Sequence, residues 1–277
     1  MKKVIIVTGA SSGIGKATAL QLIEEGHIVY GLARRVEKMQ DLIDAGGHAK
    51  ALDITDHKQI KEIIQDIKDQ QQRVDILVNN AGYAVYGPIE EIGYEQAKRQ
   101  FEVNLFGLAE ITKAVLPTMR IQNSGTVINI SSVGGKIYTP LGAWYHATKH
   151  ALEGWSDCLR LEVKQFGINV VIIEPGAIKT EFDQAMDHQF GTIEKSPYAS
   201  LKHAMEKVMK NAYKPGNYSE PMVIAETISK AIKTNNPKTR YAAGKMARQT
   251  LMGRKWLSDK GFDKMIMRMI HNLEKQG

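Results

Sequence analysis

The sequence predicts an α/β fold in which helices cover both faces of a doubly wound parallel sheet. Three observations lead to this prediction. Short apolar runs rich in β-branched residues alternate with longer segments of helical spacing. A glycine-rich turn joins the first apolar run to the first helical segment. The 277 residues are 43% hydrophobic and 24% charged, which excludes disordered and fibrous classes and allows one large domain.

The first half of the chain repeats a strand and helix unit three times. Strands are expected at residues 4–7, 27–32 and 49–52, and each precedes a helix, at 16–22, 36–44 and 58–68 respectively. A fourth strand is expected at 74–78. Residues 4–7 lead directly into glycines, so they are expected to form a strand and not the apolar core of a secretion signal. This alternation implies right-handed crossovers between parallel strands.

The second half continues the pattern with longer helices. A helix is expected at 94–119, with Pro117 in its last turn, and it is followed by a strand at 126–130. The next helix carries residues 145–149 and extends to about 166, before a strand at 169–173. A helix at 222–233 and a short strand at 240–243 complete the sheet.

Two segments depart from this alternation. Residues 180–220 form a long insertion, which we interpret as a lid over the substrate within a domain that covers residues 1–243. Residues 244–277 are expected to be a basic, Met-rich helical extension with an apolar stripe of Met265, Ile266, Met269 and Ile270. Such a stripe serves either core or dimer packing or a lipid-binding face.

Charge and cysteine content limit the partners. The formal net charge is +7, and the excess of Lys and Arg lies mainly from residue 233 onward. A dinucleotide, an acidic lipid headgroup or DNA would each suit such a basic chain. No apolar run approaches the ~18 residues of a membrane span. The single cysteine, Cys158, excludes an internal disulfide and a cysteine-rich metal site, so we expect a cytoplasmic protein without a bound metal.

The first glycine turn is the clearest candidate for a phosphate site. Gly9, Gly13 and Gly15 enclose Ser11, Ser12 and Ile14 between a strand and a helix. Glycines permit a tight turn and a close approach of the backbone to a pyrophosphate, and the helix N-terminus offers amide donors. A glycine-rich turn without a ligand is the alternative.

Residues after the second and third strands suggest which nucleotide is bound. Arg34 and Arg35 stand where a carboxylate would bind the ribose 2′-hydroxyl of NAD, and two guanidinium groups favour a 2′-phosphate instead. Solvated surface arginines are the alternative. Asp53 either accepts a hydrogen bond from an adenine amino group or serves as an N-cap or turn residue.

Asparagines follow the fourth strand and interrupt the long helix. Asn80, Ala81 and Gly82 belong to a polar turn that either lines an adenosine face or simply forms the turn. Asn104 lies inside a predicted helix, where asparagine is mildly unfavourable, and a structural hydrogen bond is its simplest explanation.

The organising stretch of the sequence runs from Tyr145 to Lys149. On a helix these two residues share one face, so the ammonium group can favour the ionised phenol and lower its pKa from the usual value near ~10. Ser132 supplies a hydroxyl that can hold the reacting oxygen. Taken alone, the pair also fits an ordinary surface contact between helix turns.

Taken together, these motifs resemble the short-chain dehydrogenase/reductase family. The resemblance covers residues 2–243 and implies a Rossmann-type subunit that binds NADP(H). It implies that Tyr145 is the general acid and base, Lys149 lowers its pKa and holds the nicotinamide ribose, Ser132 binds the substrate oxygen and Asn104 supports a water relay. Ser131 is the weaker of the two serines, because Ser132 keeps the family spacing to Tyr145. The remaining cofactor contacts are expected at Ile54, Pro175, Gly176, Ile178 and Thr180, with Thr180 on the carboxamide of the nicotinamide.

The resemblance also implies an activity and partners. We expect hydride transfer between the nicotinamide and a carbonyl or secondary alcohol. The lid and tail resemble the branch of hydroxysteroid and retinol dehydrogenases and acyl-dihydroxyacetone-phosphate reductases, which suggests a bulky apolar substrate. A 3-oxoacyl-type reductase and a catalytically silent NADP sensor are the alternatives. A homodimer or homotetramer is expected, without nucleic acid, and with at most weak peripheral membrane contact.

Overall fold

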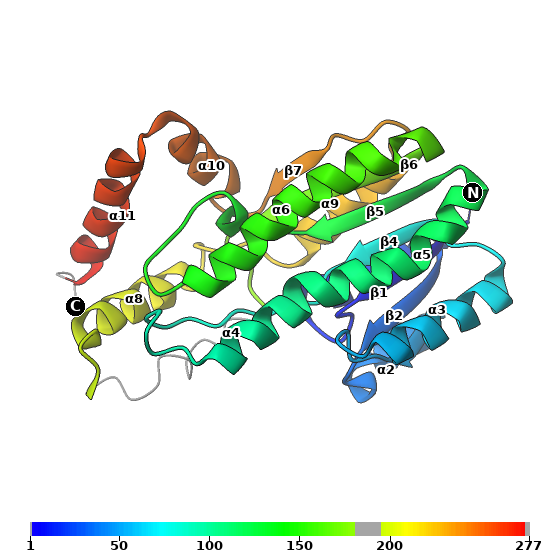
Figure 1. Cartoon of the computed structure of the whole chain (residues 1–277), viewed down its shortest axis with the longest axis horizontal. Coiled ribbons are helices and arrows are strands. Elements are labelled where there is room, and N and C mark those ends of the chain that lie inside the picture. The colour runs from blue at the N-terminus through cyan, green and yellow to red at the C-terminus, as the bar shows by residue number, and fades with distance from the viewer. Residues whose placement is uncertain (1, 181–194, 275–277) are drawn as a thin grey trace.

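A computed structural model describes residues 2–180 and 195–274 of the chain. Its centre is a seven-stranded sheet in the order β3-β2-β1-β4-β5-β6-β7 (Figure 1). Every neighbouring pair is parallel, so the predicted doubly wound sheet is confirmed. The strands are β1 (Val4–Thr8), β2 (Ile28–Ala33), β3 (His48–Ala51), β4 (Ile76–Asn79), β5 (Gly125–Ile130), β6 (Ile168–Pro175) and β7 (Arg240–Ala243).

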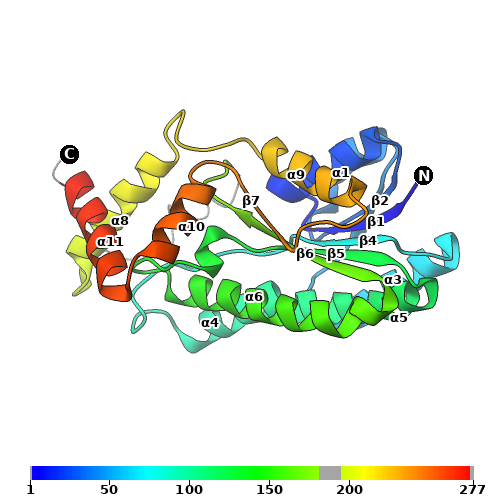
Figure 2. The same ribbon diagram turned by 90° about the horizontal axis from the view of Figure 1, so that it is seen from above.

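Helices cover both faces of this sheet, as Figure 2 shows from above. One face carries α1 (Gly13–Glu24) and α9 (Met222–Lys233), and the other carries α3 (His57–Gln71), α5 (Leu108–Gln122) and α6 (Ala143–Val163). Successive residues of β1 divide between the two layers: Ile5 joins the α1 and α9 core, whereas Ile6 joins the α3 and α5 core. The period of two in a strand therefore builds two separate hydrophobic cores on one sheet.

The long helix predicted at 94–119 is not continuous. It consists of α4 (Tyr94–Phe101), a π-helical segment (Glu102–Gly107) and α5. Asn104 lies in the π-helical segment, where its buried amide is directed to the backbone of Tyr83. The predicted last turn at Pro117 was also wrong, because α5 continues past this proline to Gln122.

The first two helices differ slightly from the predicted ranges. The helix expected at 16–22 begins earlier, because α1 starts at Gly13, within the glycine turn. The helix expected at 36–44 is divided into a 3-10 turn (Val36–Met39) and α2 (Gln40–Asp44).

Beyond the sheet, helices gather at the end where the strands terminate. They are α8 (Ala199–Ala212), α10 (Ala247–Trp256) and α11 (Asp259–Glu274). The stripe expected on α11 was partly wrong: Phe262, Ile266 and Ile270 are buried, whereas Met265 and Met269 are 39% and 42% exposed. A spacing of four residues places the buried trio on one line of the helix and the methionines beside it. Residues 181–194 of the expected lid lie outside the described residues.

Among the residues that the structure describes, no helix combines the length and apolar character needed to cross a bilayer. The same residues contain no cluster of three or more His, Cys, Asp or Glu side chains that could hold a metal ion.

Candidate active site

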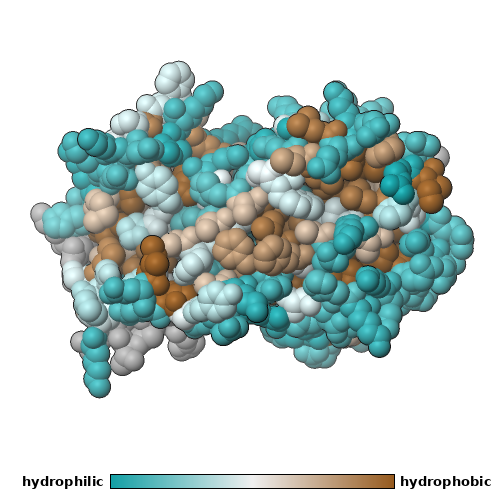
Figure 3. Space-filling view, in the orientation of Figure 1, coloured by the Kyte–Doolittle hydropathy of each residue, from teal (hydrophilic) through white to brown (hydrophobic). Residues whose placement is uncertain are grey.

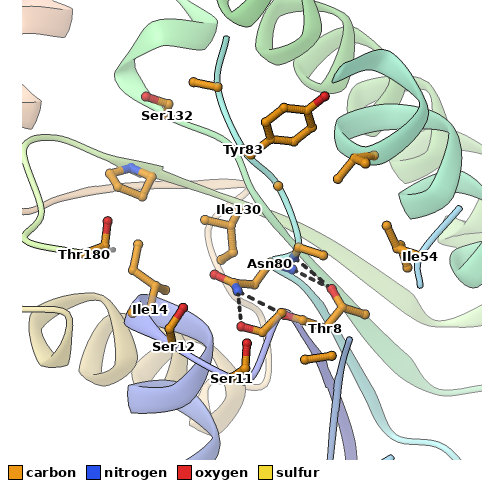
Figure 4. Close-up of a pocket in the computed structure, with 18 of the residues that line it drawn as sticks. Thr8, Ser11, Ser12, Ile14, Ile54, Asn80, Tyr83, Ile130, Ser132 and Thr180 are labelled. Atoms are coloured by element: carbon orange, nitrogen blue, oxygen red, sulfur yellow. Dashed lines mark hydrogen bonds between the residues drawn. The ribbon is translucent and has the colours of Figure 1, made fainter. Parts of the chain in front are cut away.

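A cavity of about 770 Å³ opens at the carboxyl ends of the strands (Figure 4). Ser11 and Ser12 lie at one end of the view and Ser132 and Tyr83 at the other. The fold brings nearly all of the predicted site residues to this cavity, and only Gly15 and Asn104 do not line it. Those that line it are Gly9, Ser11, Ser12, Gly13, Ile14, Arg34, Arg35, Asp53, Ile54, Asn80, Ala81, Gly82, Ser132, Tyr145, Lys149, Pro175, Gly176, Ile178 and Thr180.

The glycine turn lines one end of the cavity. Gly9 and Gly13 adopt φ values of +68° and +54°, which residues with a Cβ rarely take. Gly15 lies below the turn, where a Cβ would come within 2.3 Å of the Gly9 carbonyl oxygen. The turn therefore needs glycine at each position, and it leaves the N-terminus of α1 open to the cavity.

Asn80 fastens the end of β4 to this turn. Its amide Nδ2 donates to the carbonyl oxygens of Thr8 at 3.0 Å and Gly9 at 3.3 Å (Figure 4). In return, the Thr8 hydroxyl oxygen accepts from the backbone N–H groups of Asn80 and Ala81, both at 3.0 Å. The polar turn at Asn80 thus holds the glycine turn in shape while it lines the cavity.

Cations gather at the end of the cavity beside β2. Arg35 donates from Nη2 to the hydroxyl oxygens of Ser11 and Ser12, at 3.4 and 3.3 Å. Arg34 lines the cavity with an exposed side chain. Arg99, which comes from α4, lines it as well and was not predicted, because nothing in the local sequence marks a helical arginine for this site. This end of the cavity therefore suits an anion.

Asp53 occupies a turn that is closed by hydrogen bonds. Its carboxylate accepts from the Thr55 backbone N–H at 2.9 Å and from the Thr55 hydroxyl at 2.8 Å, and it pairs with Arg99 at 3.1 Å. Burial raises the pKa of Asp53. The Thr55 hydrogen bonds and the Arg99 charge together lower this pKa by more than burial raises it, so the pKa lies below the ordinary value. The geometry matches the turn alternative, and a contact to adenine stays a prediction.

Tyr145 and Ser132 lie together in the lining of the cavity. The Tyr145 side chain is buried, and burial raises the pKa of its phenol, while a hydrogen bond with Ser132 lowers it less strongly. The Ser132 oxygen accepts from the Gly134 backbone N–H at 3.0 Å, which leaves its own proton free to donate. The expected lowering of the Tyr145 pKa is therefore wrong in this structure, because desolvation of the phenol is the larger effect.

Lys149 lies one turn after Tyr145 and is almost fully buried. Its Nζ donates to the carbonyl oxygen of Ile130, at the end of β5, at 2.8 Å. Burial lowers the pKa of Lys149 to about 8, and the carboxylate of Glu153 partly opposes this shift. The Lys149 ammonium group therefore loses its proton near pH 8, well below the range of an exposed lysine.

Asn104 lies behind the cavity lining, where its side chain hydrogen-bonds Tyr83 and Thr148. It is 1% exposed, accepts from the Tyr83 N–H at 3.0 Å, and donates to the Tyr83 carbonyl at 2.8 Å and to the Thr148 hydroxyl at 3.1 Å. A Cβ added at Gly82 would lie 3.3 Å from Asn104 Oδ1 and 3.8 Å from Lys149 Nζ. These bonds match the structural alternative, and the water relay stays a prediction.

His146 was missed by the sequence analysis. The Thr139 N–H donates to Nε2 at 3.1 Å, so Nδ1 carries the proton and donates to the Gly134 carbonyl at 2.9 Å. Burial lowers the pKa of His146, which keeps the ring neutral as this arrangement requires. Because Gly134 in turn holds Ser132, His146 fixes the loop that positions the serine hydroxyl.

The remaining wall of the cavity is apolar and aromatic. The Tyr86 ring lies 5.9 Å from the Tyr145 ring, and Tyr213 lines the cavity from the residue after α8. Tyr86 and Tyr145 belong to a hydrophobic cluster that includes Met205 of α8 and Phe262 of α11. Sequence reasoning did not identify Tyr86 or Tyr213, because their roles depend on contacts between segments far apart in the chain.

Comparison with known proteins gives a consistent result. Residues 3–191 match the family described as "short chain dehydrogenase". The chain is 34% identical over 262 residues to a 3-ketodihydrosphingosine reductase of Bacteroides thetaiotaomicron, covering 93% of this chain and 94% of that protein.

Two solved structures are also similar. A short-chain dehydrogenase from Streptomyces avermitilis superposes with a TM-score of 0.81 at 36% identity, over 99% of this chain and 97% of that one. A variant of actinorhodin polyketide ketoreductase with NADPH gives a TM-score of 0.74 at 30% identity, over 86% of this chain and 94% of that one.

Proposed function

This chain belongs to the short-chain dehydrogenase/reductase family, and from that premise we propose that it reduces the carbonyl group of a lipid-like substrate with NADPH. The enzyme is an oxidoreductase of this family. The observation that carries the proposal is the convergence of Ser132, Tyr145 and Lys149 on the cavity that the glycine turn and the two arginines also line.

The described residues fit a nicotinamide dinucleotide phosphate. The glycine turn and the N-terminus of α1 would offer backbone amides and the short side chains of Ser11 and Ser12 to a pyrophosphate. Arg34 and Arg35 would hold the 2′-phosphate. Thr180, whose side chain would lie 3.1 Å from a Cβ placed on Gly13, would hold the carboxamide of the nicotinamide. When bound, such a dinucleotide supplies the two electrons of the reduction.

The protein's own residues would manage the proton and the orientation. Ser132 would donate to the substrate oxygen, because the hydrogen bond that it accepts from the Gly134 N–H uses a lone pair and not its proton. Tyr145 donates the proton that the developing alkoxide needs, and its raised pKa keeps the phenol protonated at neutral pH. Lys149 holds a positive charge beside the reacting centre and serves the cofactor ribose.

The proposed substrate class follows from the cavity wall. Tyr86 and Tyr213 line the cavity and pack in the cluster that α8 and α11 help to form, so they would accept a large apolar body next to Tyr145. The similarity to a 3-ketodihydrosphingosine reductase supports a ketone on a lipid-like molecule.

The test is NADPH oxidation with a panel of carbonyl compounds. We expect turnover with 3-ketodihydrosphingosine in detergent micelles and with apolar ketones, and little with small hydrophilic ketones of equal reactivity. Faster turnover of small hydrophilic ketones than of apolar ones would contradict the substrate class. Tight NADPH binding with no turnover across the panel would instead identify a sensor.

A 3-oxoacyl-type reduction is the second candidate, because the chain is similar over 86% of its length to a polyketide ketoreductase. β-Ketoacyl thioesters therefore belong in the same panel. A kcat/KM at least tenfold higher for these thioesters than for 3-ketodihydrosphingosine would favour this candidate.

A homodimer or homotetramer in the cytoplasm is part of the proposal. Figure 3 shows apolar residues gathered over the middle of the face that α5 and α6 form. Phe106, Ile121 and Leu161 are exposed large apolar residues of this helical layer. A second copy would cover them, and light scattering of the purified protein measures the assembly.

A further inference from the structure

The C-terminal helices present a surface that the proposed reaction does not use. Residues 244–277 contain eight Lys and Arg against three Asp and Glu, so they hold most of the net charge of +7. Their exposed cations are Lys245, Arg248, Lys255, Lys260, Lys264 and Arg268. None of these six forms an ion pair within residues 2–180 and 195–274.

Large apolar side chains are interleaved with these cations. Trp256 is 79% exposed and Met252 is 62% exposed, one helical turn apart on α10. Arg248, Met252 and Lys255 follow one line of the same helix. The exposed apolar members are Met246, Met252, Trp256, Leu257, Met265, Met267 and Met269, and together with the six cations they are called the extension patch.

The extension patch is held on a fixed support. The Tyr138 hydroxyl donates to Asp263 at 2.9 Å, and the rings of Tyr138 and Phe262 meet edge to face at 5.1 Å. Arg254 pairs with Asp259 at 2.6 Å and lies over both rings. These contacts pair two exposed acids of the extension, Asp259 and Asp263, with partners in the fold, so cations and apolar groups without such partners predominate on the rest of its surface.

We propose that the extension patch docks this protein on an anionic lipid bilayer. Lysine and arginine are attracted to anionic headgroups, while Trp and Met side chains enter the boundary between headgroups and acyl chains. A nucleic acid would be matched by the cations but not by seven exposed apolar side chains. The opposite charge of the lipid surface and the exposed apolar side chains among the cations therefore favour a bilayer.

The extension patch lies at the same end of the molecule as the active-site cavity, so docking would bring the cavity close to a lipid substrate. Helices α8, α10 and α11 lie together at the end of the molecule where the strands terminate, far from α3 (Figure 2). Tyr213, directly after α8, lines the active-site cavity. The benefit for catalysis rests on the proposed lipid-like substrate, whereas the docking itself does not.

The test is sedimentation of the full chain with vesicles of phosphatidylcholine alone or with 30% phosphatidylglycerol. We expect binding to the anionic vesicles at low salt, loss of binding in 0.5 M NaCl, and little binding to neutral vesicles. The triple variant Lys245→Glu, Arg248→Glu, Lys255→Glu should raise the lipid concentration for half-binding at least about tenfold. Trp256→Ser should raise it severalfold and lower the blue shift of tryptophan fluorescence on binding.

The matched control reverses three exposed lysines outside the extension, Lys58 and Lys61 on α3 and Lys113 on α5. This control should bind vesicles nearly as the wild type does. Equal loss in both triple variants, or no sedimentation of the wild type with anionic vesicles, would overturn the proposal. A changed oligomeric state of Trp256→Ser by light scattering would also overturn it, since the patch would then contact a second copy. NADPH oxidation with a water-soluble ketone is measured in parallel, so that a failure of docking is distinguished from a failure of the proposed reaction.

Discussion

The two ends of the active-site cavity are built in different ways. The end at the glycine turn consists of backbone and of polar or charged side chains that directly follow β1, β2 and β4, and most of its residues lie within short motifs. The end at Tyr86 and Tyr213 is lined by aromatic side chains from the loop after β4 and from the residue after α8, and these side chains pack in a cluster with apolar residues of α8 and α11. A shared cofactor geometry is thus encoded locally, whereas substrate selectivity depends on contacts between distant segments.

Tyr145 is the residue that joins the two ends, so its substitution gives the largest expected effect. Tyr145→Phe should lower kcat by roughly 10²–10⁴-fold, because the proton donor is lost. The dissociation constant of NADPH, measured by fluorescence titration, should change little. A variant with the turnover of the wild type would contradict the assigned role.

Removal of the cations tests the cofactor end alone. Arg34→Ala combined with Arg35→Ala should weaken NADPH binding by roughly 10²–10⁴-fold, since hydrogen bonds to charged groups contribute about 1.5–3 kcal/mol for each arginine. Binding of NADH should change little. The charge-matched control is Lys58→Ala with Lys61→Ala on α3, which lies outside the cavity. Equal losses for the two cofactors would refute the 2′-phosphate assignment.

Substitution of Tyr213 tests the substrate end alone. Tyr213→Ala should raise KM for an apolar ketone by roughly tenfold, because a large aromatic contact surface is lost, and should leave NADPH binding unchanged. Tyr218→Ala, in the same segment but outside the cavity lining, serves as the control. If both variants weakened NADPH binding, the two ends would not be independent.

The smallest expected effect concerns the charge on Lys149. Its pKa is about 8 in the folded protein, below the value near ~10.4 expected for the unfolded chain. Between these values the unfolded state binds more protons, so this group makes the free energy of unfolding rise with pH, by on the order of 2 kcal/mol from pH 7 to 10.

Lys149→Met lacks this contribution. The free energy of unfolding of the wild type minus that of Lys149→Met should therefore increase over this pH range in urea titrations. A difference that does not depend on pH would show that the ammonium is not desolvated as the structure indicates.

The sequence by itself determined the sheet, the glycine turn and the positions of Ser132, Tyr145 and Lys149. Each depends on a short pattern whose physical cause is local: the period of a strand, the positive φ of Gly9 and Gly13, or the spacing of one helical turn. Parallel strands then place such motifs at one edge, which is why residues far apart in the chain could be assigned to one site.

Only the tertiary structure decided the features that depend on burial and on partners from elsewhere. The π-helical segment at Asn104, the neutral His146 and the contribution of Arg99 to the cavity arise from contacts across the fold. The direction of the Tyr145 pKa changed for the same reason: spacing places Lys149 nearby, but desolvation depends on everything that covers the phenol. On α11, Phe262 is buried in the cluster that includes residues of α8, whereas Met265 and Met269 are exposed.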